Sequence, residues 1–205
     1  MSTELFLTED QDDALREITN IGMGHAGEQL AQVLNTFVEL SIPKLVITSP
    51  SDLTLNMNKM VALDDEVTSV RQAFFGHWRG EALTMFQEPD CNQLAQMMGY
   101  TEDLDRDLEV ELMLDVSNIL VGACLNGIAH TLNVELNFSP PSLIAKRATL
   151  DELFKTSAFE WQHVLLMQVC FKLENIDFTA HLVMMISEDS LNTLQGDLDS
   201  FLEDL

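Results

Sequence analysis

The chain has 205 residues, of which 46% are hydrophobic and 21% are charged, a composition typical of a globular protein. Ten basic against 34 acidic residues give a formal net charge of −24, which argues against binding to nucleic acid or to an anionic membrane, since both attract clustered Lys and Arg. No apolar run approaches the roughly 20 residues of a membrane span, and the acidic first residues lack the basic start of a secretory signal.

The first half of the chain predicts a long helix, then strands, then a short helix. Thr8 and Gln11 fit a capping box, and the helical period that follows holds to about Phe37. The later segments predict, in order, an extended segment with a strand, a stretch of loosely alternating apolar residues, two antiparallel strands and a short helix, at residues 41–50, 51–59, 66–87 and 88–99.

The second half repeats this order. Residues 101–106 are charged and poor in apolar side chains, so we place the boundary there, with half-repeats at about 1–100 and 101–205. The repeated elements are a long helix, a strand, a pair of strands and an amphipathic helix, at residues 109–132, 142–147, 161–187 and 187–205. We predict one α+β domain over residues 1–205, in which two pseudo-symmetric halves share an antiparallel sheet with two long helices on one face.

A shift of 98 positions aligns the two long helices and indicates an internal duplication. The residues that coincide at this shift are Asn20/Asn118, Gly24/Gly122, Ala31/Ala129, Leu34/Leu132, Asn35/Asn133, Ser41/Ser139 and Pro43/Pro141. So many identities at one shift are the reason for treating the two helices as copies.

One face of each long helix carries an acidic residue and an asparagine one turn apart. At roughly 100° per residue, the face of the first helix contains Asp13, Glu17, Asn20, Gly24 and Gly27. The corresponding residues of the second helix are Glu111, Asp115 and Asn118. A single pair at this spacing is common on a solvated helix, but its recurrence favours a function. Because glycine inside a helix costs about 1 kcal/mol relative to alanine, we expect another backbone to approach this face closely.

Other chemistries lack support in the sequence. Gly22, Gly24 and Gly27 spell G-x-G-x-x-G, but that motif binds a dinucleotide only after a strand and at the start of a helix, and here helical spacing precedes it. The five histidines show no zinc-binding spacing, and no nucleophile elbow or Walker loop is present. Cys91, Cys124 and Cys170 have no paired spacing, so we expect reduced core thiols in a cytoplasmic protein.

The duplicated pattern of Glu or Asp, two residues, Asn, and a Pro about 21 residues later resembles the CheC/CheX/FliY phosphatases of bacterial chemotaxis, and CheC most of all. Residues 17–34, EITNIGMGHAGEQLAQVL, are particularly similar to the first signature helix of that family. The resemblance extends over nearly the whole chain, as two complete half-repeats.

The resemblance implies hydrolysis of the aspartyl-phosphate on a CheY-like response regulator. In that mechanism Asn20 and Asn118 enter the regulator's site and orient the attacking water, while Glu17 and Asp115 bind the regulator. Asp13, Gly24, Gly27 and Glu111 would contact the partner. The regulator would bring its own Mg²⁺, so no metal or cofactor of this chain is expected. Family members also act with a CheD-like deamidase, which is a second possible partner.

The second half departs from the family pattern at two positions. Asp115 stands where Glu is expected and is one methylene shorter, and Leu125 stands where the first half has Gly27. We therefore rank the Glu17/Asn20 pair above the Asp115/Asn118 pair. The alternative function is a non-catalytic adaptor that keeps the fold and binds a regulator or a deamidase.

Overall fold

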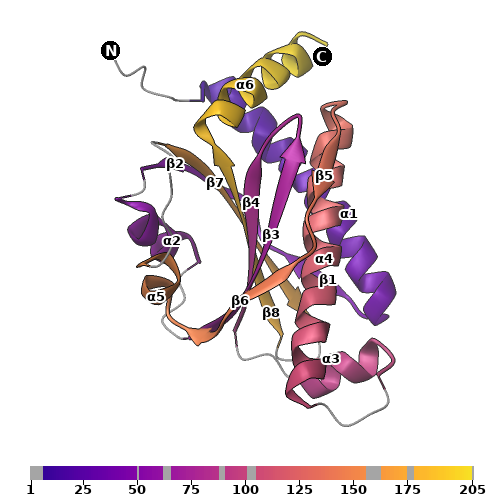
Figure 1. Cartoon of the computed structure of the whole chain (residues 1–205). Coiled ribbons are helices and arrows are strands. Elements are labelled where there is room, and N and C mark those ends of the chain that lie inside the picture. Colours follow the sequence, from indigo (N-terminus) through magenta and orange to yellow (C-terminus); the bar gives the residue numbers. More distant parts are fainter. Residues whose placement is uncertain are drawn as a thin grey trace.

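A computed structural model describes residues 7–49, 51–61, 66–87, 91–100, 105–155, 163–174 and 178–204 (Figure 1). Its helices are α1 (Glu9–Leu34), α2 (Leu53–Val61), α3 (Cys91–Met97), α4 (Arg106–Thr131), α5 (Leu150–Lys155) and α6 (Glu188–Glu203). Its strands are β1 (Val38–Leu40), β2 (Lys44–Thr48), β3 (Val67–Gly76), β4 (Gly80–Gln87), β5 (Leu136–Phe138), β6 (Ser142–Ala148), β7 (Val164–Leu173) and β8 (Thr179–Ser187).

The strands of the described residues form one antiparallel sheet, which combines both halves of the chain. The path across the sheet is β1-β7-β8-β4-β3-β5, with β2 also paired to β7 and β6 also paired to β3. The first strands of each half therefore pair with the hairpin of the other half, and β4 and β8 meet at the centre. The predicted fold class is confirmed, because the two halves follow the same order of elements and share the sheet.

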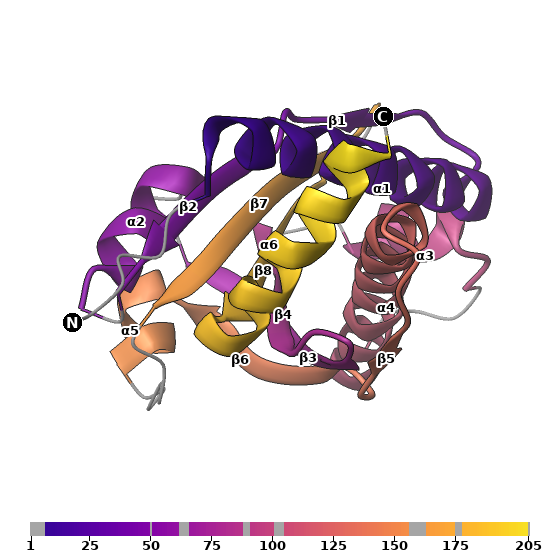
Figure 2. The same cartoon turned by 90° about the horizontal axis from the view of Figure 1, so that it is seen from above.

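The two long helices pack against one face of this sheet (Figure 1) and against each other. Gly22 of α1 and Gly127 of α4 mark the closest approach: a Cβ on Gly22 would lie 2.6 Å from the carbonyl oxygen of Cys124, and one on Gly127 would lie 2.6 Å from the Cα of Gly22. Seen from above, α6 crosses the end of the sheet beside the start of α1 (Figure 2). Helices α2 and α5 lie on the opposite face, over a second, smaller core.

Local signals explain where the long helices begin and end. The capping box at Thr8 forms as predicted, because its hydroxyl accepts from the backbone of Gln11 while the Gln11 side chain accepts from the backbone of Thr8. At the other ends, Asn35 and Asn133 adopt the left-handed conformation, with φ of 48° and 54°. Asparagine tolerates this conformation, which turns the chain out of the helix. Both copies of the duplicated helix thus keep the asparagine that ends the helix.

Several sequence predictions need correction. Helix α1 ends at Leu34 and not near Phe37, because Asn35 leaves the helical conformation. Residues 53–61 form a helix, although their apolar residues alternate loosely: Leu53, Met57 and Met60 recur at helical spacing and are the buried ones. The short strands β1 and β5 and the helix α5 were not predicted, and most of the proposed boundary, residues 101–104, lies outside the described residues.

Helix α4 is long and apolar enough to cross a membrane by length and composition alone, over residues 107–131. In this structure 61% of its most apolar window is buried against the rest of the protein. Its apolar character is therefore explained by its packing against both α1 and the sheet.

Candidate functional site

The first acid–amide pair lies on the exposed side of α1. Glu17 and Asn20 are both exposed, as are Asp13 one turn before them and Gly24 one turn after. Neither Glu17 nor Asn20 makes a side-chain hydrogen bond or an ion pair with another residue in the described part of the chain. The Asn20 carboxamide is thus free to rotate and to meet a partner molecule.

The second pair is also exposed, but its side chains are held. Asn118 Oδ1 accepts a hydrogen bond from Gln72 Nε2 at 3.0 Å, and Asp115 Oδ2 accepts one from the Tyr100 hydroxyl at 3.0 Å. Burial and then the bond to Asp115 raise the pKa of Tyr100. Glu111 is exposed on the same helix, one turn before Asp115.

The glycines of the first helix divide between two surroundings. Gly24 has nothing within 4 Å of the position of a Cβ and lies on the exposed side with Asn20. Gly27 is buried, and the Leu40 side chain covers it at 3.0 Å, so it does not share the exposed surface of the other predicted contact residues. The close backbone approach expected at the polar face occurs instead at Gly22, against α4.

Apolar side chains border the first pair. Ile21 follows Asn20 on α1 and is 40% exposed, while Leu40 and Ile42, on the chain segment beside α1, are 38% and 78% exposed. Arg16 Nη1 donates to the carbonyl oxygen of Pro43 at 3.0 Å, which fixes this segment against the helix. A docking protein would therefore meet exposed carboxylate and amide groups beside apolar contact area.

Metal and thiol chemistry find little support in the described residues. No group of three or more His, Cys, Asp or Glu side chains among them is arranged to hold a metal ion. Cys124 is fully buried, and burial raises the pKa of its thiol to about 12, so it is not a nucleophile near neutral pH. Burial first, and then the nearby Lys44 and Lys172, lower the pKa of His181 to about 4, so this histidine is neutral in the sheet near neutral pH.

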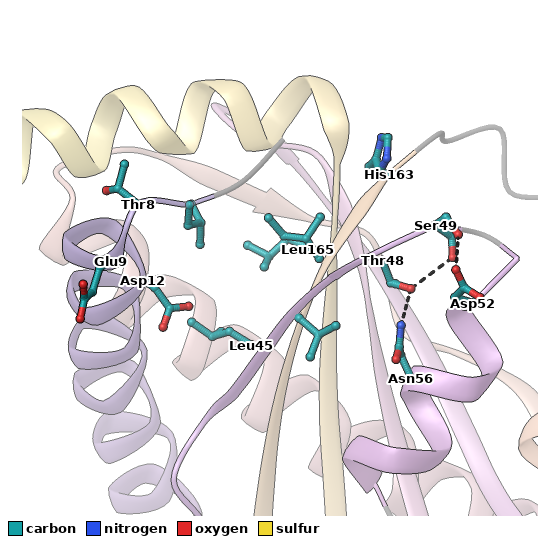
Figure 3. A pocket seen from close by; sticks show the side chains of 13 residues that line it. Thr8, Glu9, Asp12, Leu45, Thr48, Ser49, Asp52, Asn56, His163 and Leu165 are labelled. Carbon is teal, nitrogen blue, oxygen red and sulfur yellow. Dashed lines mark hydrogen bonds between the residues drawn. The ribbon is translucent and has the colours of Figure 1, made fainter. Parts of the chain in front are cut away.

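A cleft of about 480 Å³ lies away from both pairs, between the start of α1, the edge strand β2 and the start of α2 (Figure 3). Thr8, Glu9 and Asp12 line one side, and Asp52 and Asn56 line the other. None of the predicted site residues lines this cleft. The candidate site is consequently an exposed helix surface and not a pocket, which suits a protein partner better than a small substrate.

Sequence reasoning did not find the residues that hold the second pair. Gln72 lies 46 positions before Asn118, on β3, and only the sheet brings the two together. The sequence offers one signal for Gln72: it is a polar residue on a strand face on which the neighbouring residues, Val70 and Phe74, are apolar.

Comparison with known proteins finds chains similar to this one. Residues 11–47, which include Glu17, Asn20 and Gly24, match the CheC-like family. Over 198 residues the chain is 25% identical to CheY-P phosphatase CheC of Bacillus subtilis (strain 168), with 92% of this chain and 93% of that protein covered. The chain is similar to CheC-like proteins in its first helix by the family model and along most of its length by this relative.

Solved structures share the CheC-like fold. FliY of Thermotoga maritima superposes with a TM-score of 0.71 at 18% identity, covering 96% of this chain and 100% of that one. The middle domain of FliM from H. pylori superposes with a TM-score of 0.61 at 10% identity, covering 93% and 99%. Since one fold can carry several functions, the shared fold alone does not establish catalysis.

Proposed function

We propose that this CheC-like protein is a phosphatase that hydrolyses the aspartyl-phosphate of a CheY-like response regulator in chemotaxis signalling. The observation that carries the proposal is the exposure of both asparagines, Asn20 and Asn118, each one turn after an exposed carboxylate on a long helix. An amide that enters another protein's active site must be accessible, and both are.

The chemistry requires little from this chain beyond position. Phosphoryl transfer is accelerated mainly by holding the attacking water in line and by balancing charge, and the regulator supplies its own Mg²⁺ and aspartate. The Asn20 amide has both an acceptor oxygen and a donor NH₂, so it can orient a water molecule against the phosphorus. Glu17, which has no ion-pair partner among the described residues, would attract a cationic side chain of the regulator.

The alternative is a non-catalytic adaptor that binds a regulator, or a CheD-like deamidase, through the same surface. The observation in its favour is that FliM shares the fold. Both functions place the protein in the cytoplasm with its partner, so localisation does not separate them.

The deciding experiment measures the loss of phosphate from a phosphorylated CheY-like regulator in the presence of wild type, Asn20→Ala, Asn118→Ala and the double variant. We expect wild type to accelerate dephosphorylation and the double variant to lose roughly 100-fold of that acceleration, the scale of a misplaced positioning group. Asn126→Ala is the matched control, since Asn126 is an exposed asparagine of α4 outside both pairs.

Binding is measured separately, with beryllofluoride bound to the regulator's aspartate as a non-hydrolysable mimic of the phosphoryl group. The phosphatase proposal expects the double variant to keep most of its affinity while it loses the acceleration. If binding occurs and wild type gives no acceleration, the protein is an adaptor and the phosphatase proposal is wrong.

A further inference from the structure

Gln72 of β3 stands directly behind the second amide. Its side chain is 2% exposed, and its Nε2 donates to Asn118 Oδ1 at 3.0 Å and to the carbonyl oxygen of Ser139 at 2.9 Å. A backbone carbonyl only accepts hydrogen bonds, so the Gln72 atom that faces Ser139 must be the NH₂ group. The Asn118 atom that faces the same NH₂ group must then be its oxygen. The two bonds together fix which end of the Asn118 amide points inward.

Among the described residues, no side chain holds the first amide in this way. Ser139 accepts from the backbone of Ala73 at 3.0 Å, and in the first half Ser41 accepts from the backbone of Cys170 at 2.9 Å. These matching bonds make Ala73 the counterpart of Cys170, so the counterpart of Gln72 is the preceding residue of β7, Val169. Val169 is fully buried and has no polar side-chain atom to offer Asn20.

A buried glutamine at this place is unfavourable for stability alone. Its Oε1 is buried and has no hydrogen-bond partner in the described residues. A valine fills the equivalent position without leaving a polar atom unpaired. A buried polar group that is kept in spite of this disadvantage needs a reason other than packing.

We propose that Gln72 is a positioning residue for the second site: it holds the Asn118 carboxamide in one orientation, with its NH₂ group and the second lone pair of its oxygen directed outward. This inference rests on the proposed function. The first amide must be ordered by the regulator during docking, whereas the second is ordered beforehand. The second site therefore compensates for its shorter Asp115 by a fixed amide, contrary to the ranking that the sequence suggested.

The activity test uses the Asn20→Ala background, so that only the second site works. Gln72→Val copies Val169, the equivalent residue at the first site, and Gln72→Met keeps the length of the side chain without its amide. We expect either change to lower kcat for regulator dephosphorylation by roughly three- to tenfold, the scale of one hydrogen bond, with KM little changed. Unfolding by urea should show equal or higher stability, because a buried unpaired oxygen is removed.

Gln168→Val is the matched control. Gln168 is also 2% exposed and also has an unpaired Oε1 among the described residues, but it lies on β7, separated from β3 by β8 and β4, and contacts His181. This change should leave kcat unaltered. A loss of kcat in Gln72→Val that is accompanied by an equal loss of stability, or matched by Gln168→Val, would mean that Gln72 serves packing only.

A second measurement is independent of catalysis. The side-chain NH₂ signal of Asn118, assigned by its absence in Asn118→Ala, should show higher order in ¹⁵N relaxation than that of Asn20. In Gln72→Val its order should fall to the level of Asn20. If the order of the Asn118 NH₂ group does not change in Gln72→Val, Gln72 does not position Asn118, whatever the activity. If no asparagine-dependent acceleration exists, the proposed phosphatase function fails. The relaxation measurement still decides in that case whether Gln72 positions Asn118.

Discussion

The crossing of the two long helices gives a stability prediction that two glycines of one helix can test. Gly22 and Gly24 are separated by a single residue in α1, so alanine at either position gains the same helix propensity, about 1 kcal/mol. Their surroundings differ. An alanine Cβ at position 22 would lie 2.6 Å from the Cys124 carbonyl oxygen and 3.2 Å from the Ile128 backbone nitrogen, whereas nothing lies within 4 Å of a Cβ at position 24.

The cost at position 22 falls on backbone atoms, which no rotamer change can move away. Helix α4 has to shift from α1, and it is held on its other side by the sheet. Overpacking of this kind costs about 1–3 kcal/mol, so after the propensity gain of about 1 kcal/mol Gly22→Ala should be destabilising by up to about 2 kcal/mol. Gly24→Ala should be stabilising by about 0.5–1 kcal/mol. Because the propensity gain is the same in both variants, they should differ by the overpacking cost alone, which for a chain of this size is about 2–12 °C in Tm.

The assay is urea and thermal unfolding followed by far-UV circular dichroism, with both variants measured beside wild type. If Gly22→Ala is as stable as Gly24→Ala, the close helix crossing does not exist in solution. Gly24→Ala has a second use, because Gly24 is a proposed contact residue. A variant that is more stable yet slower on the phosphorylated regulator would separate the role of Gly24 in docking from any role in the fold.

Two further predictions concern buried polar groups away from the pairs. Asp197→Ala should lower stability by about 1–3 kcal/mol, because the buried indole N–H of Trp78 donates to Asp197 Oδ2 at 2.7 Å and would lose its partner; an unchanged urea midpoint would contradict this. His181 has a pKa of about 4 in the folded protein and of about 6.5 in the unfolded chain. Between these two pH values the unfolded state binds the proton and the folded state does not, so stability should fall as pH drops from about 6.5 to 4. His181→Gln should remove this component, up to about 3 kcal/mol, from urea titrations; parallel pH profiles for the variant and wild type would contradict it.

The sequence predicted the fold well because its strongest signals are local or repeated. The capping box at Thr8, the asparagines that end both helices and the shift of 98 positions all act within a few residues or recur. Helix α2 was missed because residues 51–59 carry apolar side chains at both two-residue and helical spacing, and only burial against the second core separates the two periods. The pairing of each half's first strands with the other half's hairpin depends on tertiary structure, and no local pattern encodes it.

For the candidate site too, the features within one helix could be predicted and those that depend on tertiary structure could not. Glu17, Asn20, Asp115 and Asn118 could be identified because each pair lies within one turn of a helix. The helical spacing of roughly 100° per residue could not predict which glycines of α1 are exposed. Leu40 of β1 covers Gly27, whereas Gly24, less than one turn earlier, is exposed. Gln72 and Tyr100 reach their partners only through the folded sheet and the turn after α3.

The exchange of strands between the halves has a functional consequence. Strand β3, from the first half, supports the asparagine of the second half through Gln72, and strand β7, from the second half, contacts α1 where Met167 meets the Thr19 hydroxyl, next to the asparagine of the first. Each candidate site is therefore built from both copies of the duplication. A substitution on one strand, such as Gln72 in place of a valine, changes the support of one amide and leaves the helix surface that meets the partner unaltered. Two copies of one helix can in this way keep a common docking surface while their amides differ in how firmly they are held.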